Sequence, residues 1–411
     1  MLIALALAAA CGRETKVDER WLARPEIARA EAPPAESMFA DVYVDGTLSM
    51  TGFVADSDST YVRLLDELEG SLANKWKKSA DLRYFKFGKS VRQVTRQDFR
   101  GARNNAFYVE KGIYETTDID LVAARATPQR LAVAVTDLFQ RDQDVNPIVS
   151  SIRKNVFEKN LSAGILAISS EFDGKVYDAR TAAYRYTSRK GSPTTYRPFY
   201  LLMFGDAAAI EQLVAALGER SFIDRSRFLL ISPHVIRRYQ VAATKRPGSK
   251  SLKARAGDGN AGEFNFDIRK DGQGGVIDTV IRLQQNPDAA DFKADGVEIV
   301  VRQTHPKVNE THDLSLQSIR RTGDVLNAAL LLEIGAPEGK YSYDVLFRTR
   351  GAGAFTVPKW VQDLSSENPS PLRDANRTLN LERFVTELID ADASIHKPGL
   401  AFVRLNVRKL G

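Results

Sequence analysis

The sequence contains a single cysteine, which excludes disulfide scaffolds and cysteine-rich zinc sites. Its four histidines form no His-Glu-x-x-His pattern, so the commonest signature of zinc hydrolases is also missing. A strong excess of one sign of charge is also missing, because 58 Lys+Arg residues are nearly balanced by 52 Asp+Glu residues. A net charge of +6 spread over 411 residues gives no reason to expect a nucleic-acid partner. What is present is ordinary globular composition, with 43% hydrophobic residues and enough length for two to three domains.

The only long apolar run is residues 1–10, directly before Cys11. Ten residues are too few to span a bilayer, which needs about 20, but they suit the apolar core of a signal segment that ends in small residues. The run resembles the end of a bacterial lipoprotein signal, although the usual basic residues before it are missing. The resemblance implies that residues 1–11 form a signal segment and that Cys11 carries a lipid. A buried helix with an incidental thiol is the alternative.

Residues 12–37 are charged, rich in alanine and proline and free of an apolar period, as expected of a flexible tether. As a flexible coil this tether would have a reach of roughly 25–30 Å. The lipoprotein resemblance therefore implies a folded body held near a membrane of the bacterial cell envelope, in the periplasm or at the surface.

Residues 38–220 alternate short apolar runs with helical patterns, which predicts an α/β domain. The expected strands are residues 39–44, 82–87, 131–135, 163–169 and 199–204, and the expected helices are 61–73, 118–125, 145–157 and 207–217. Apolar strands separated by helices predict a doubly wound, mostly parallel sheet with helices on both faces. Ligands of such folds bind at the carboxyl ends of the strands.

The residues at those strand ends carry a recognisable motif. The first strand is followed by Asp45-Gly46-Thr47-Leu48-Ser49, the fourth by Asp137, and Thr117 precedes a predicted helix. This arrangement resembles the D-x-S-x-S metal-ion-dependent adhesion site of von Willebrand factor type A domains, which have a Rossmann-like fold. The resemblance implies that a divalent cation is held by Asp45, Thr47, Ser49, Thr117 and Asp137. Two departures are Thr47 in the first serine position and Leu138 where the family usually has glycine.

The chemistry of these five side chains also favours a divalent cation, independently of the family resemblance. All are hard oxygen donors, which suit Mg²⁺, Ca²⁺ or Mn²⁺ rather than a soft metal. Only Asp45 and Asp137 are carboxylates, so a bound ion would keep positive charge and an open position for a carboxylate of a partner protein. The alternative is that Asp45 and Thr47 merely cap the turn after the first strand, with no ion bound.

Residues 221–411 change to short alternating segments separated by Gly, Asn, Asp and Pro. The expected strands are residues 263–268, 276–283, 297–301, 314–319, 328–334, 341–347 and 400–407. Several strands at this spacing predict an all-β, sandwich-like domain. One helix is expected near residues 380–390, with Asn380 as its cap.

These features predict a membrane-tethered binding protein rather than an enzyme, with a protein partner bound through the divalent cation. A metal-assisted hydrolase at the same sheet edge is one alternative, in which Asp118 and Asp120 would serve as bases. A subunit of an envelope complex with a vestigial metal site is another. The sequence shows no nucleophile elbow or histidine base beside the motif, which favours the binding protein.

The segment 225–255 holds many Lys and Arg residues and no acidic residue. It could be a patch for anionic lipid or an acidic partner, or solvated charge that resists aggregation. If the charges are only solvated, replacing Lys250 and Lys253 together by Glu leaves binding to anionic vesicles unchanged. Vesicle co-sedimentation measures this, and a clear loss of binding would assign the segment to a contact surface instead.

Overall fold

The computed structural model describes residues 37–76, 80–113, 115–138, 144–177, 183–255, 262–306, 308, 311–368 and 373–411, without the side chains of 71–76. The predicted signal segment, Cys11 and residues 12–36 of the predicted tether lie outside these ranges, so lipidation at Cys11 stays a prediction. Within the described ranges, no helix combines the length and the apolar character needed to cross a bilayer.

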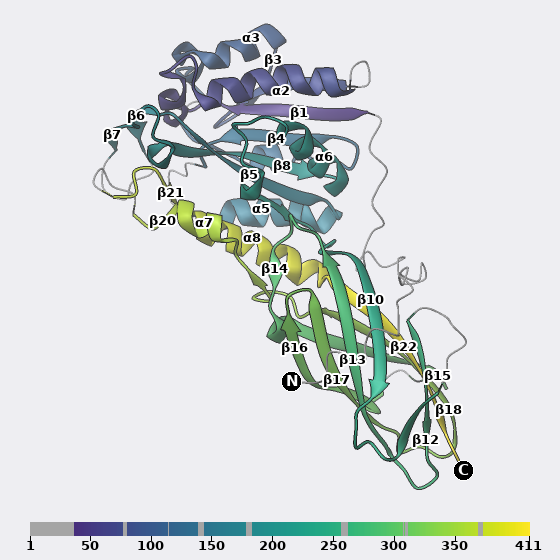
Figure 1. Ribbon diagram of the computed structural model, residues 1–411. Helices are drawn as coiled ribbons and strands as arrows, with labels where there is room; N and C mark the ends of the chain where they lie inside the picture. The colour runs from purple at the N-terminus through teal and green to yellow at the C-terminus, as the bar shows by residue number, and fades with distance from the viewer. Residues whose placement is uncertain are drawn as a thin grey trace.

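The first half of the chain forms a mixed seven-stranded sheet (Figure 1). Its strands are β1 (Met38–Asp45), β2 (Ala80–Phe87), β3 (Val91–Val94), β4 (Leu131–Thr136), β5 (Ser162–Ser170), β8 (Arg197–Gly205) and β9 (Phe228–Ile231). Their order is β3-β2-β1-β4-β8-β5-β9. Because β9 pairs with β5, the sheet extends past the expected domain boundary at residue 220.

The prediction of a mostly parallel sheet is wrong. Only β1 pairs in parallel, with β2 and β4, whereas β8 lies between β4 and β5 and runs antiparallel to both. A parallel neighbour needs a crossover connection, usually a helix. The described residues between β5 and β8 form the hairpin β6 (Asp173–Val176) and β7 (Tyr184–Thr187) and a short 3-10 turn, η6 (Pro193–Thr195). The chain therefore returns beside β5 in the opposite direction.

Helices cover both faces of this sheet (Figure 1). One face packs against α2 (Thr60–Trp76) and α6 (Ala207–Leu217), and the other against α4 (Asp120–Ala123) and α5 (Asn146–Asn155). The remaining short helices are α3 (Arg96–Arg100), α7 (Lys359–Leu364), η1 (Leu48–Val54), η3 (Gly101–Arg103), η4 (Asn105–Tyr108), η5 (Phe157–Lys159), η7 (Arg225–Arg227) and η8 (Ala294–Gly296). The apolar periods of the sequence thus mark buried helix faces.

The second half forms two further sheets that enclose a common apolar core. The first is β10 (Ile236–Lys245), β13 (Gly274–Gln285), β17 (Val325–Glu333) and β16 (Leu314–Thr322). The second is β11 (Leu252–Arg255), β12 (Glu263–Ile268), β22 (Gly399–Lys409), β18 (Gly339–Thr349) and β15 (Val297–His305). Two small pairs, β14 (Asp291–Phe292) with β19 (Phe355–Thr356) and β20 (Ser365–Ser366) with β21 (Thr378–Leu379), complete it.

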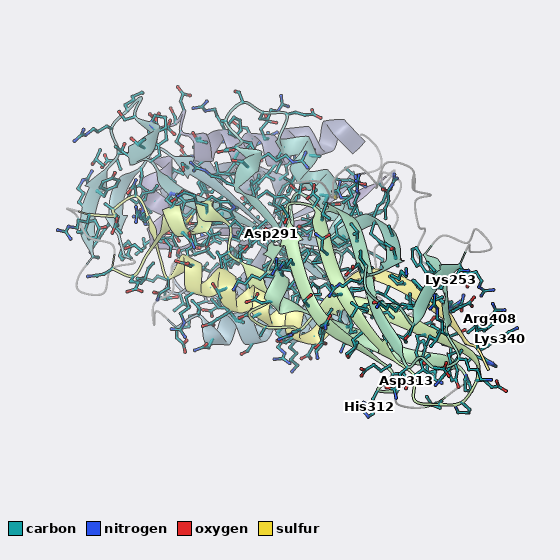
Figure 2. All side chains as sticks on the ribbon, turned by 60° about the horizontal axis from the view of Figure 1, so that its bottom comes forward. Lys253, Asp291, His312, Asp313, Lys340 and Arg408 are labelled. Atoms are coloured by element: carbon teal, nitrogen blue, oxygen red, sulfur yellow. The ribbon has the colours of Figure 1, made fainter. Side chains whose placement is uncertain are left out.

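The basic residues of segment 225–255 are spread over η7, β10, the turn between β10 and β11, and β11. Several of its arginines pair with carboxylates from other elements, as Arg237 does with Glu211 at 2.9 Å and Arg246 with Asp278 at 2.7 Å. Lys253 lies near Lys340 and Arg408 at the far end of the sandwich (Figure 2), in a cross-strand row that includes Asp267. Arg408 donates to Asp267, which reduces the net charge of that row.

One helix of the second half packs on the first sheet. Helix α8 (Leu381–His396) lies beside α5 (Figure 1), and its buried residues include Phe384, Leu388 and Ile389. These side chains belong to one continuous apolar core that runs from the lower face of the seven-stranded sheet into the sandwich. The two halves therefore share a core instead of meeting through a polar linker.

Because Leu388 is 1% exposed in this shared core, Leu388→Ala is expected to lower the free energy of unfolding by about 2–5 kcal/mol. The protein should still unfold in one transition, since the core is continuous. Urea unfolding followed by far-UV circular dichroism and by tryptophan fluorescence measures both. The matched control is Arg383→Ala on the exposed side of α8, with an expected loss below about 1 kcal/mol. Separate transitions for the two probes would contradict a shared core.

Candidate functional site

The register of β1 against β4 brings two distant segments to one edge of the sheet. Val44 pairs with Val135 in parallel, so the next residues, Asp45 and Thr136, lie side by side. Strand β4 is buried along its whole length and β1 everywhere except at Phe39, and each strand ends in a polar turn at the same edge. The polar side chains that follow the two strands therefore converge.

All five side chains predicted from the sequence meet at this edge. Asp45 Oδ1 accepts hydrogen bonds from Thr47 Oγ1 at 2.7 Å and from Thr47 N at 3.0 Å. Ser49 Oγ lies 3.0 Å from Thr47 Oγ1 and donates to Asp137 Oδ1 at 3.0 Å. Thr117 Oγ1 donates to Asp45 Oδ2 at 3.2 Å. The five side chains are no more than 6% exposed, so they form one compact cluster of oxygen atoms.

Thr136 is a sixth member that the sequence reasoning missed. Its Oγ1 donates to Asp45 Oδ2 at 2.7 Å and accepts from the backbone N of Leu138 at 3.1 Å. The signal that could have found it is the strand register, because residues paired across parallel strands point to the same side of the sheet. Thr136 thus joins the Asp45 carboxylate to the turn that carries Asp137.

The turn after β1 requires glycine at position 46. A Cβ there would lie 2.5 Å from Cε of Lys86, whose side chain is only 2% exposed. Lys86 Nζ in turn binds Glu110 Oε2 at 2.8 Å, which fixes the lysine stem beneath the turn. Gly46 N also donates to the carbonyl of Phe87 at 2.7 Å. The backbone that presents Thr47 and Ser49 is therefore held by close packing against β2.

Leu138 adopts a left-handed backbone conformation, with φ of 62°. This is the position at which the resembled family usually has glycine, the residue that adopts such a conformation at least cost. A leucine there costs roughly 1–2 kcal/mol in backbone energy. The side chain is 8% exposed and belongs to the apolar core, so its burial offsets that cost. Leu138 therefore keeps the left-handed backbone conformation that a glycine would adopt at this position.

The Asp45 carboxylate is stabilised only partly by its surroundings. Complete burial raises the pKa of Asp45, while the hydrogen bonds from Thr136, Thr47 and Thr117 lower it, and the pKa stays above its usual value. The groups that bind this carboxylate are hydroxyls and a backbone amide, which are neutral. A positive ion at the cluster would favour the charged carboxylate.

The donor set of the cluster is compatible with such an ion, because all of its side chains offer hard oxygen atoms. Neighbouring oxygens of the cluster lie between 2.7 and 3.4 Å apart. Ligands on adjacent positions of an octahedral Mg²⁺ ion, about 2.0–2.1 Å from the metal, are about 2.9 Å apart. Among the described residues no group of three or more His, Cys, Asp and Glu side chains forms a conventional metal cluster. A cation held here would therefore depend on hydroxyl groups for most of its ligands.

Comparison with known proteins identifies no relative of this chain. No family model, no curated protein and no solved structure matches the chain. The assignment of the site rests on the residues and their geometry.

Because Thr136 serves both Asp45 and the Leu138 amide, Thr136→Val should lower the free energy of unfolding by about 1–3 kcal/mol. Valine has nearly the same shape but leaves two buried polar groups without this partner. Chemical denaturation measures the change. Thr136→Ser is the matched control, because it keeps the hydroxyl and should lose less. Equal stability of the valine variant and the wild type would show that these hydrogen bonds contribute nothing net.

Proposed function

We propose that this protein is a divalent-cation-dependent binding protein of the von Willebrand factor type A kind, which captures a partner through a carboxylate. The observation that carries the proposal is the convergence of Asp45, Thr47, Ser49, Thr117 and Asp137 on one cluster. The motif lies at the carboxyl ends of two parallel strands in a mixed sheet covered by helices on both faces, which is where ligands of such sheets bind.

In this proposal the five side chains hold Mg²⁺, Ca²⁺ or Mn²⁺, directly or through water. The bound cation supplies positive charge that attracts a carboxylate of the partner protein. Only two of the five ligands are carboxylates, and hydroxyl ligands donate less electron density than carboxylates, so the ion would remain able to bind a further carboxylate. Leu48, Thr116 and Asp118 are partly exposed at the rim of the cluster, so the partner would approach over them.

The rest of the proposal concerns where the protein works. The apolar run 1–10 and Cys11 support a lipid anchor, and hence a place at a membrane of the bacterial cell envelope. The sandwich would then act as a spacer or a second contact surface. Since it shares a core with the first sheet, it would hold the cation site in a set orientation relative to the rest of the chain.

Titration of Mg²⁺, Mn²⁺ and Ca²⁺ by calorimetry tests the proposal. Saturable binding is expected for the wild type, and Asp45→Asn should weaken it at least tenfold because it removes one of the two charges. A cation at 100 times its Kd should also stabilise the fold by about 2.7 kcal/mol, which thermal unfolding detects without a partner.

The matched control is Asp41→Asn. Asp41 is a buried aspartate on the same strand, but it pairs with Arg83 at 2.7 Å and Arg130 at 3.0 Å at the opposite end. This variant should keep the cation affinity of the wild type. Thr47→Ser should keep it as well, since the hydroxyl remains. Absence of saturable binding of all three ions to the wild type would overturn the proposal.

A further inference from the structure

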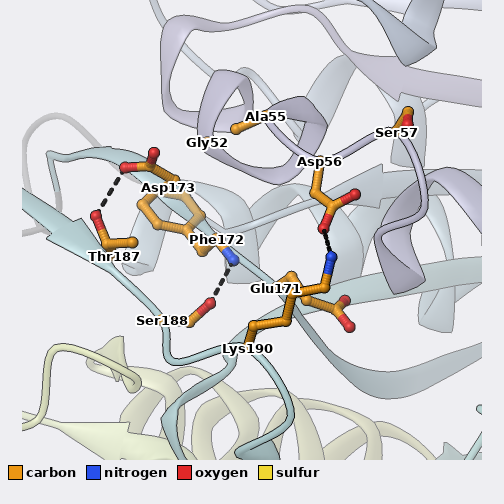
Figure 3. Close-up of a pocket in the computed structure, with 10 residues that line it drawn as sticks. All are labelled: Gly52, Ala55, Asp56, Ser57, Glu171, Phe172, Asp173, Thr187, Ser188 and Lys190. Atoms are coloured by element: carbon orange, nitrogen blue, oxygen red, sulfur yellow. Dashed lines mark hydrogen bonds and ion pairs between the residues drawn. The ribbon is translucent and has the colours of Figure 1, made fainter.

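A cavity of about 360 Å³ opens beside η1, between the segment from Gly52 to Ser57 and the turn after β5 (Figure 3). Its three carboxylates are each paired with a basic side chain, so the cavity keeps little charge for a ligand. The pairs are Asp56 with Lys190 at 3.3 Å, Asp173 with Arg185 at 2.8 Å and Glu171 with Arg63 at 3.9 Å. Charge that is not balanced in this way lies at the far end of the sandwich.

Four strands of the sandwich carry a row of charged side chains at that end (Figure 2). The row is Lys253, Asp267, Arg408 and Lys340, in neighbouring positions of β11, β12, β22 and β18. Along each strand the row alternates with side chains of the apolar core, such as Ile268, so the row faces outward. The spacing of neighbouring strands gives the row a width of about 14 Å.

The row has one carboxylate, and two arginines share it. Arg408 Nη2 lies 2.9 Å from Asp267 Oδ2, and Arg255 Nε lies 3.6 Å from Asp267 Oδ1. Within the described part of the chain, Lys253 and Lys340 form no ion pair, and both are exposed. Four basic side chains against one carboxylate leave a net charge of +3 on this face.

The turns beside the row add to this charge. Lys250, in the turn between β10 and β11, and Arg269 and Lys270, in the turn after β12, are all exposed. A hydrogen bond of 2.9 Å from the Arg269 amide to the end of the turn that carries Lys250 holds the two turns together. The exposed acids of these turns and of the turn before β18, Asp271 and Glu338, are fewer.

Two of the positive groups are held directly opposite each other. Lys340 pairs with Arg408 across β18 and β22, and both side chains lie on the outer face. Like charges in directly opposed positions of neighbouring strands destabilise a sheet. Phosphate groups over the row would remove this repulsion, so an anionic ligand would stabilise an arrangement that costs the free protein stability.

The topology places this end of the sandwich away from the cation cluster. Strand β9 runs antiparallel to β5 and therefore to β1, so β9 ends at the edge of the sheet where β1 begins. The chain enters β10 from that edge (Figure 1), and the ten residues of β10 span about 33 Å. The predicted tether, residues 12–37, precedes β1 at the same edge, and its reach of roughly 25–30 Å is similar. The row and the tether can therefore reach the same surface.

We infer that this outer face of the sandwich binds the anionic headgroups of a phospholipid membrane, through Lys253, Arg255, Lys340 and Arg408. The inference rests on the proposed place of the protein at a membrane. The row lies on the open face of a sheet, which suits an extended layer of phosphates better than one small anion. Each basic side chain near an anionic membrane surface adds to the attraction. Binding in this orientation would leave the cation cluster pointing away from the lipid, where a partner can reach it.

Co-sedimentation with vesicles tests the inference, with Cys11→Ser in every arm so that no lipid anchor contributes. The full chain should bind vesicles of one part phosphatidylglycerol to three parts phosphatidylcholine at low ionic strength, and phosphatidylcholine vesicles much more weakly. Each neutralised lysine should weaken binding about fivefold, so Lys253→Gln with Lys340→Gln should weaken it about 25-fold. Lys253→Arg with Lys340→Arg should keep the affinity, because the charge remains.

The matched control neutralises two exposed lysines at the opposite edge, Lys89→Gln with Lys111→Gln. The Lys89 amide donates to the carbonyl of Ile113 at 3.1 Å, which places both lysines near the turn after β1. This control should change vesicle affinity less than about twofold. Equal losses in the control and in the row variant would reduce the effect to net charge and overturn the surface.

Urea unfolding checks that the row variant is folded. It should be at least as stable as the parent chain, because Lys340→Gln removes one of two opposed like charges. A loss of vesicle binding that is accompanied by unfolding would not count, and Lys253→Gln alone, with its expected fivefold loss, then serves as the test.

Soluble polyphosphate, titrated by calorimetry, distinguishes a membrane from a free polyanion. Saturable binding of polyphosphate without a preference for anionic vesicles would assign the row to a free polyanion and overturn the membrane assignment. Equal binding to anionic and neutral vesicles would overturn it as well. Asp45→Asn should leave vesicle binding unchanged and the row variant should keep its divalent-cation affinity, so failures of the two proposals are distinguishable. Because every arm lacks the anchor, a negative result leaves lipidation at Cys11 as a separate question.

Discussion

The parallel pairing of β1 with β4 is the constraint on which the edge of the first sheet depends. It sets Asp45 beside Thr136, and the Asp45 carboxylate then accepts hydrogen bonds from hydroxyls on three separate segments, through Thr47, Thr117 and Thr136. A slip of one residue in this register would turn every side chain of β4 to the opposite face. The buried, apolar strands prevent such a slip, because it would exchange the two cores on either side of the sheet.

Because the core is shared, the second half of the chain helps to cover and stabilise the first sheet. Helix α8 completes the cover of one face beside α5, and a hydrogen bond of 2.8 Å joins Tyr200 of β8 to Thr378 of β21. A substitution in α8 therefore acts on the same cooperative unit as one under β4. The sandwich is better described as a part of one folded body than as a separate module on a linker.

The 3-10 turn η1 lies between the oxygen cluster and the hairpin of β6 and β7. Ser49 faces a cluster that we propose holds a divalent cation, and Gly52 borders a cavity with three carboxylates. Their closeness follows from the packing of β6 on η1 through Gly52 and Gly174, since this contact places the turn after β5 next to the turn after β1.

The sequence by itself determined where most strands lie and which oxygen-bearing side chains meet. Residues 263–268 form β12 as expected, and Asp45, Thr47, Ser49, Thr117 and Asp137 do converge, because alternation and strand ends are local signals. Only the tertiary structure decided the direction of β8, the inclusion of β9, the docking of α8 and the role of Thr136. Each of these depends on which distant segment becomes a neighbour, and burial of an apolar strand stabilises it about equally in either direction. The cavity beside η1 belongs to the same group, since Gly52 and Glu171 are more than a hundred residues apart.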